Sequence, residues 1–106
     1  MLLNKKNFKF VFIGAGSSVF TMRLVGDILG EKSLEKGHLA LVDIDKKLLG
    51  EVDAAVTNLV QHTGREFIVS AHTDFRTALD GADFVIFTFA TGGYIRWKKD
   101  IEISTK

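Results

Sequence analysis

The sequence contains neither cysteine nor proline among its 106 residues. The lack of cysteine excludes disulfide bonds, a thiolate nucleophile and thiolate metal ligands within these residues. The lack of proline leaves glycine, Asp, Asn and Ser to build the turns. No apolar run approaches the roughly 20 residues that span a bilayer. The apolar segment 8–13 is short and leads into glycine rather than a signal-cleavage site. We therefore expect a cytoplasmic protein with no membrane partner.

The charges are nearly balanced, with 14 basic and 13 acidic residues and a formal net charge of +1. This balance argues against nucleic acid as a partner. Hydrophobic residues make up 46% of the chain and charged residues 25%, which is typical of a globular domain. A chain of this length buries about two-thirds of its unfolded surface, so a true core is expected.

Apolar segments that suit strands alternate with segments of helical period. Strands are predicted over 8–13, 38–43, 67–69 and 83–89, with helices over 19–29, from Asp45 onward, and through Ala78 and Leu79. Asp45 is predicted to cap the second helix, and Thr73 or Asp74 the third. Gly30 is expected to end the first helix in a left-handed conformation, and Gly81 to close the third.

The apolar residues of the second helix form two adjacent stripes. Leu48, Val52, Ala55 and Leu59 share a face, with Leu49, Val56 and Val60 beside it. The β-α-β-α-β-α-β order predicts an α/β fold, a Rossmann-like parallel sheet with strand order 3-2-1-4. A complete dinucleotide fold has further strands. Residues 1–106 are therefore interpreted as a partial N-terminal Rossmann domain, truncated after the fourth strand.

The loop Gly14-Ala15-Gly16-Ser17 lies where the first strand meets the first helix. Gly14 permits a tight turn, and Gly16 lets the backbone approach a pyrophosphate without a Cβ in the way. Ser17 and Ser18 offer hydroxyl donors, and the helix N-terminus adds unpaired N–H groups. The dinucleotide fingerprint wants a third glycine at position 19, where this chain has valine, so a plain strand-to-helix turn remains an alternative.

Asp43 ends the second strand, 29 residues after Gly14, whereas the usual spacing is about 20. The polar segment 31–37 accounts for the difference. A carboxylate there accepts both ribose hydroxyls of adenosine and repels a 2′-phosphate, which favours NAD over NADP. A solvated strand-end charge is the alternative, and Lys46 and Lys47 lie nearby.

The segment Thr91-Gly92-Gly93 follows the fourth strand, beside the switch point where such sheets bind ligands. It is predicted to lie near the nicotinamide half, with a plain turn as the alternative. His38, His62 and His72 lack metal-ligand spacing and are given no role. The predicted cofactor contacts are Gly14, Ala15, Gly16, Ser17, Ser18, Asp43, Thr91, Gly92 and Gly93, and no catalytic or metal-binding residue is predicted.

Several of these segments together resemble glycoside hydrolase family 4, over nearly the whole chain. The matching segments are Phe12-Ile13-Gly14-Ala15-Gly16-Ser17, Leu24-Val25-Gly26-Asp27, Leu41-Val42-Asp43-Ile44-Asp45 and Ala82-Asp83-Phe84-Val85-Ile86. The family tolerates a residue other than glycine at position 19. The loop is more similar to the α-galactosidases and α-glucosidases than to the 6-phospho-β-glucosidases.

The resemblance implies an unusual glycoside hydrolysis that needs NAD and a divalent metal, often manganese. NAD⁺ oxidises the sugar C3 hydroxyl, the C2 proton is removed, the glycosidic oxygen is eliminated, water adds, and hydride returns. The family's metal ligands, a cysteine and a histidine, and its tyrosine base lie beyond residue 106. The resemblance therefore implies a small glycoside as substrate and an inactive fragment. An open edge at the fourth strand is expected to promote self-association into a homo-oligomer.

Two other functions remain as alternatives. One is the front half of a lactate- or malate-type dehydrogenase, whose order of elements is the same. Those enzymes usually continue with a proline-containing substrate loop, and this chain has no proline. The other is a nucleotide-sensing module without catalytic residues.

Overall fold

The computed structural model describes residues 7–88, 96–97 and 101–102. Four parallel strands form one sheet in the order β3-β2-β1-β4, which confirms the predicted topology. These strands are β1 (Asn7–Ile13), β2 (Lys36–Val42), β3 (Glu66–His72) and β4 (Phe84–Phe87). A separate antiparallel pair is formed by β5 (Arg96–Trp97) and β6 (Ile101–Glu102).

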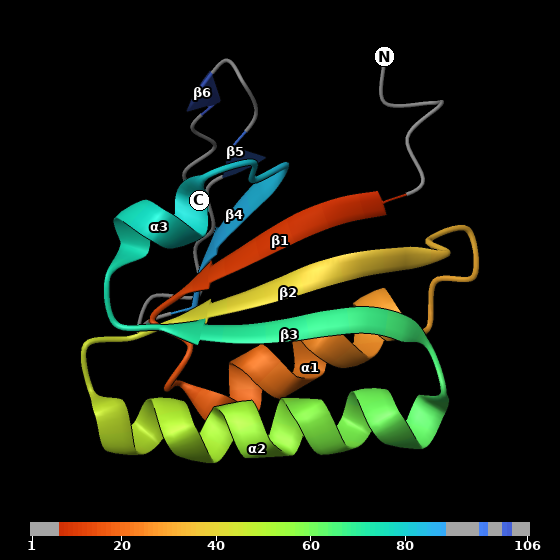
Figure 1. Ribbon diagram of the computed structural model, residues 1–106, viewed down its shortest axis with the longest axis horizontal. Coiled ribbons are helices and arrows are strands. Elements are labelled where there is room, and N and C mark those ends of the chain that lie inside the picture. Colours follow the sequence, from red (N-terminus) through yellow and green to blue (C-terminus); the bar gives the residue numbers. More distant parts are fainter. Residues whose placement is uncertain (1–6, 89–95, 98–100, 103–106) are drawn as a thin grey trace.

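The helices lie on both faces of the sheet, as right-handed crossovers require. Figure 1 shows α1 (Ser18–Leu29) and α2 (Lys46–Thr63) on one face and the short α3 (Phe75–Leu79) on the other. The larger core lies under α1 and α2, where Phe12, Leu39 and Leu41 meet Val25 and Val56. The smaller core lies under α3 and consists of Val11, Ala40, Val42, Ala78 and Val85.

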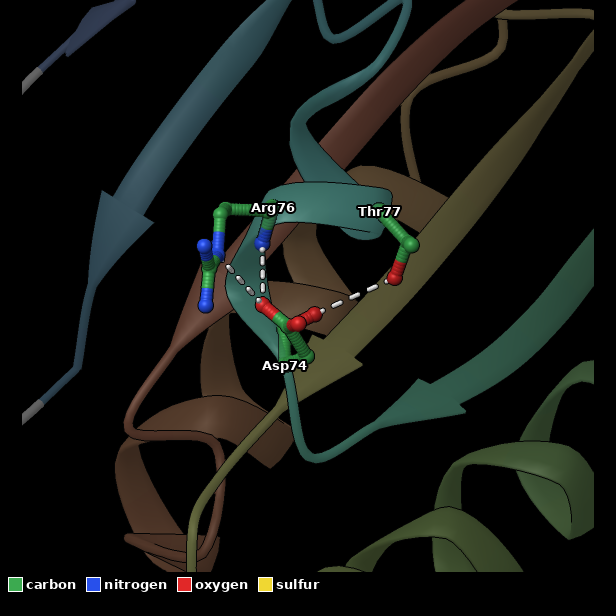
Figure 2. A network of polar contacts seen from close by, with 3 residues as sticks. All are labelled: Asp74, Arg76 and Thr77. Atoms are coloured by element: carbon green, nitrogen blue, oxygen red, sulfur yellow. Dashed lines mark hydrogen bonds and ion pairs between the residues drawn. The ribbon is translucent and has the colours of Figure 1, made fainter.

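Short polar side chains begin the second and third helices, as predicted. The Asp45 carboxylate accepts hydrogen bonds from the N–H groups of Lys47 and Leu48, both at 3.1 Å. The Asp74 carboxylate accepts one from Arg76 at 2.9 Å, as Figure 2 shows, so Asp74 rather than Thr73 is the cap. Gly81 follows α3 with a φ of +74°, a conformation that favours glycine.

The predicted left-handed end of α1 at Gly30 is wrong. Gly30 has φ −80° and ψ −9°, in the right-handed helical region. The chain continues in the same hand because the Glu31 N–H donates to the Ile28 carbonyl at 3.1 Å. The guanidinium of Arg65, which follows α2, donates to the carbonyls of Leu29, Glu31 and Leu34. Arg65 thus holds the last carbonyl of α1 and two carbonyls of the following loop, so the loop is fixed without a left-handed residue at Gly30.

Three further boundaries or faces differ from the expectation. The third strand spans seven residues, Glu66–His72, because it pairs with all of β2. The fourth strand spans Phe84–Phe87, the four residues that pair with β1. The buried side of α2 consists of Leu49, Val52, Val56 and Val60, whereas Leu48 and Ala55 are exposed. The buried side of α2 is therefore the second of the two predicted stripes, together with Val52 from the first.

Candidate functional site

The loop between β1 and α1 is a tight turn fastened to the end of β2. Gly14 has a φ of +82°, which glycine adopts without steric cost. The N–H groups of Gly14 and Ala15 both donate to the Val42 carbonyl, at 2.8 and 2.9 Å. The Ser17 N–H donates back to the Gly14 carbonyl at 3.0 Å. The predicted tight turn at Gly14 is confirmed, and its shape is set by the neighbouring strand.

A buried threonine on α1 holds this loop through a side-chain hydrogen bond. The Ala15 side chain is fully buried and packs into the larger core. The Ala15 carbonyl accepts a hydrogen bond at 3.0 Å from the Thr21 hydroxyl, which is itself fully buried. Sequence reasoning did not single out Thr21. Its only signal was a hydroxyl placed among the apolar residues of the first helix.

The two main residues of the predicted site, Gly16 and Asp43, are in direct contact. The Gly16 N–H donates to Asp43 Oδ2 at 2.7 Å, and Asp43 Oδ1 accepts the Asp45 N–H at 2.9 Å. A Cβ at position 16 would lie 2.7 Å from Asp43 Oδ2 and 2.9 Å from the Leu48 Cβ. Glycine is thus required here by the protein's own carboxylate. Each carboxylate oxygen retains capacity to accept a further hydrogen bond.

The backbone donors suited to a bound anion lie at the beginning of α1 rather than in the loop. The loop N–H groups of residues 14–17 donate to acceptors within the protein. The N–H groups of residues 18–20, in the first turn, have no acceptor within the helix. The exposed Ser17 side chain makes no capping hydrogen bond. The positive end of the helix dipole therefore faces outward with donors suited to an anion.

Four of the predicted cofactor contacts lie in parts of the chain that the structure does not describe. Thr91, Gly92 and Gly93 lie outside the described residues, as does the side chain of Ser18.

Within the described residues, no group of three or more His, Asp or Glu side chains is placed to hold a metal ion. No helix in the same part of the chain combines the length and apolar character needed to cross a membrane.

Comparison with known proteins places this site in a family. The model of the family 4 glycosyl hydrolases matches residues 9–106. An alpha-glucosidase of Erwinia rhapontici is 36% identical over 96 residues, which cover 90% of this chain and 21% of that protein. An alpha-galactosidase of Bacillus subtilis (strain 168) is 36% identical over 86 residues, 81% of this chain and 20% of its own length. An alpha-galactosidase of Rhizobium meliloti (strain 1021) is 35% identical over 100 residues, 94% of this chain and 20% of its own length.

The match includes the loop at residues 14–17 and Asp43, since both lie inside residues 9–106. The chain spans about a fifth of the length of these three relatives. Family membership favours the glycosidase hypothesis over the lactate- or malate-type dehydrogenase and the sensing module. The chain belongs to the family 4 glycosyl hydrolases.

Proposed function

We propose that this chain holds NAD for a glycosidase that acts on α-glucosides or α-galactosides. The observation that carries the proposal is the contact between Gly16 and Asp43, which places a carboxylate next to the opening of α1. A dinucleotide needs both features within its length, because it carries two phosphates and an adenosine ribose. The names of the three relatives support the substrate class.

The described residues fit the adenosine and pyrophosphate parts of NAD. The first-turn N–H groups of α1 and the Ser17 hydroxyl would hold the phosphates. The remaining lone pairs of Asp43 would accept the ribose hydroxyls, and its negative charge would repel a 2′-phosphate. Val19 and Ile44 are 79% and 90% exposed and flank the loop and Asp43 in sequence. They offer apolar surface to an adenine ring.

Bound NAD would supply reversible oxidation of a sugar hydroxyl, which is the chemistry that the resemblance to glycoside hydrolase family 4 implies. The chain's own contribution would be to bind and orient the cofactor. Thr91, Gly92 and Gly93 remain proposed contacts for the nicotinamide half. The divalent metal, proposed as manganese, would be held by residues outside this chain. We therefore expect no glycosidase activity from residues 1–106 alone, in a cytoplasmic protein that self-associates.

Titration calorimetry of the chain with NAD and NADP tests the binding role. NAD is expected to bind more tightly than NADP. Asp43→Ala should weaken NAD binding and reduce this preference, because the ribose acceptor and the repelling charge are both removed. Asp27→Asn, which alters an exposed carboxylate on α1, is the matched control and should bind NAD like the wild type. Equal affinity for both cofactors in the wild type would contradict the proposed role of Asp43.

The whole protein tests the reaction. Turnover of nitrophenyl α-glucosides or α-galactosides should require both NAD and manganese. Removal of either by dialysis or chelation should abolish turnover, and its return should restore it. Oxidation of malate or lactate without glycoside turnover would instead support the dehydrogenase alternative.

A further inference from the structure

Three polar side chains from two neighbouring strands converge on the sheet face that carries α3. His38 belongs to β2, while Ser70 and His72 belong to β3. Parallel pairing places Ser70 beside Ala40 and His72 beside Val42, so the three side chains share one face. His38 Nε2 lies 2.6 Å from Ser70 Oγ, and His72 Nε2 lies 2.8 Å from the same oxygen. Two ring nitrogens therefore point at one position from adjacent strands.

Hydrogen bonding within this cluster engages both Nε2 atoms. The Ser70 hydroxyl has a single proton, so it donates to one ring, and the Nε2–H of the other ring donates to the Ser70 oxygen. A bound metal ion would replace both hydrogen bonds, with each ring proton on Nδ1. All three residues are half-buried, which limits competition from water. Burial lowers the pKa of His38, and the positive charge of Lys9 lowers it further. Neutral imidazole is the form that binds metals.

We propose that His38 and His72 chelate one divalent transition-metal ion through their Nε2 atoms, with the Ser70 hydroxyl beside it. Imidazole nitrogen suits Zn²⁺ and Ni²⁺, whereas Mg²⁺ prefers oxygen ligands. Metal–nitrogen bonds of about 2.0–2.1 Å require only that the two rings turn toward a shared ion in place of the shared hydroxyl. Water completes the coordination, because two imidazoles are fewer than the four ligands of a closed structural site.

The surroundings indicate a site of moderate affinity that links two strands. Lys9, on β1, is the nearby cation that acts on His38, and it opposes a bound metal ion. Its ammonium group donates to the Asp80 carbonyl at 2.6 Å, which holds the side chain in place. β3 is the outer strand of the four-stranded sheet beyond β2. A metal bound by both histidines would fasten β3 to β2 and stabilise the folded chain.

Titration calorimetry of the untagged chain with NiCl₂ or ZnCl₂ tests this site. One ion per chain is expected, with MgCl₂ producing no binding heat. His38→Gln and His72→Gln should each weaken Ni²⁺ binding at least tenfold. His62→Gln is the matched control, because His62 is the third histidine of the chain and lies on α2. It should bind Ni²⁺ like the wild type.

Thermal unfolding followed by circular dichroism provides a second measurement. Ni²⁺ should raise the unfolding midpoint of the wild type and of His62→Gln, but not of His38→Gln or His72→Gln. If a glutamine variant fails to fold, the ring ¹⁵N signals of the wild type decide. The Nε2 signals of His38 and His72 should then shift on adding Zn²⁺. Absence of Ni²⁺ and Zn²⁺ binding, or binding lost only in His62→Gln, would overturn the proposal.

Discussion

Replacing Gly16 with alanine is the sharpest test of how the loop is built. The backbone at position 16 has no positive φ, since the described glycines with positive φ are Gly14, Gly64 and Gly81. Any cost of the substitution therefore comes from space rather than from backbone strain. The new Cβ would lie 2.7 Å from Asp43 Oδ2, 3.2 Å from Asp43 Cγ and 2.9 Å from the Leu48 Cβ. Contacts below 3.0 Å force a neighbour to move.

The magnitude follows from which neighbour yields. The Leu48 Cβ is fixed to the backbone of the first turn of α2, so it moves only with the helix. Asp43 can rotate away, but it then gives up the N–H donors of Gly16 at 2.7 Å and Asp45 at 2.9 Å. Overpacking costs about 1–3 kcal/mol, and a hydrogen bond to a charged group contributes about 1.5–3 kcal/mol. We expect Gly16→Ala to lower the free energy of unfolding by about 1–3 kcal/mol.

Equilibrium unfolding in urea, followed by circular dichroism, measures this loss. Gly50→Ala is the matched control, because Gly50 is a helical glycine of α2 and a Cβ there would meet nothing within 4 Å. That substitution should stabilise the chain by about 0.5–1 kcal/mol. In an Asp43→Ala background, the Gly16→Ala penalty should shrink, since only the Leu48 contact remains. A penalty of equal size in both backgrounds would refute the reasoning.

Substitutions at three further residues test other contacts of the fold. Arg65→Ala should lower the free energy of unfolding in urea by about 1–3 kcal/mol, because three carbonyls lose their donor. Arg65→Lys should recover only part of this stability, because an ammonium lacks the guanidinium fork. Full recovery by lysine would contradict the proposed role of the guanidinium. Thr21→Val should cost about 1–3 kcal/mol by leaving the buried Ala15 carbonyl without its hydroxyl donor, whereas Thr21→Ser, which keeps the donor, should cost less. The Arg76 backbone N–H, followed by the Arg76 charge, lowers the pKa of Asp74 below its ordinary 3.8. The ionised carboxylate therefore stabilises the folded chain above pH 3.8, and this contribution is lost as the pH falls further. Asp74→Asn should flatten the acid side of a plot of unfolding midpoint against pH, and an unchanged slope would exclude this role.

Local patterns in the sequence were sufficient for the four strands of the parallel sheet, the three helices between them and their order, but they did not predict β5 and β6. Apolar and β-branched runs predicted the strands, and the helical spacing of apolar residues predicted the helices between them. Asp45 and Asp74 marked helix beginnings because a short carboxylate beside a helix start satisfies backbone donors only two or three residues away. The order 3-2-1-4 followed because right-handed crossovers leave few ways to connect such elements. The glycine loop and Asp43 were also identified from local patterns, since each lies at the carboxyl end of a predicted strand.

Contacts between distant residues were decided only by the tertiary structure. Gly30 stays right-handed in a loop that Arg65, 35 residues later in the chain, holds through the Leu29 carbonyl at the end of α1 and the loop carbonyls of Glu31 and Leu34. β3 extends to seven residues because β2 offers partners along its full length. The bond between Gly16 and Asp43, and the convergence of His38 with His72 on Ser70, depend on strand register and loop path. Propensity and period act over a few residues, whereas register and loop path are set by packing of the whole sheet.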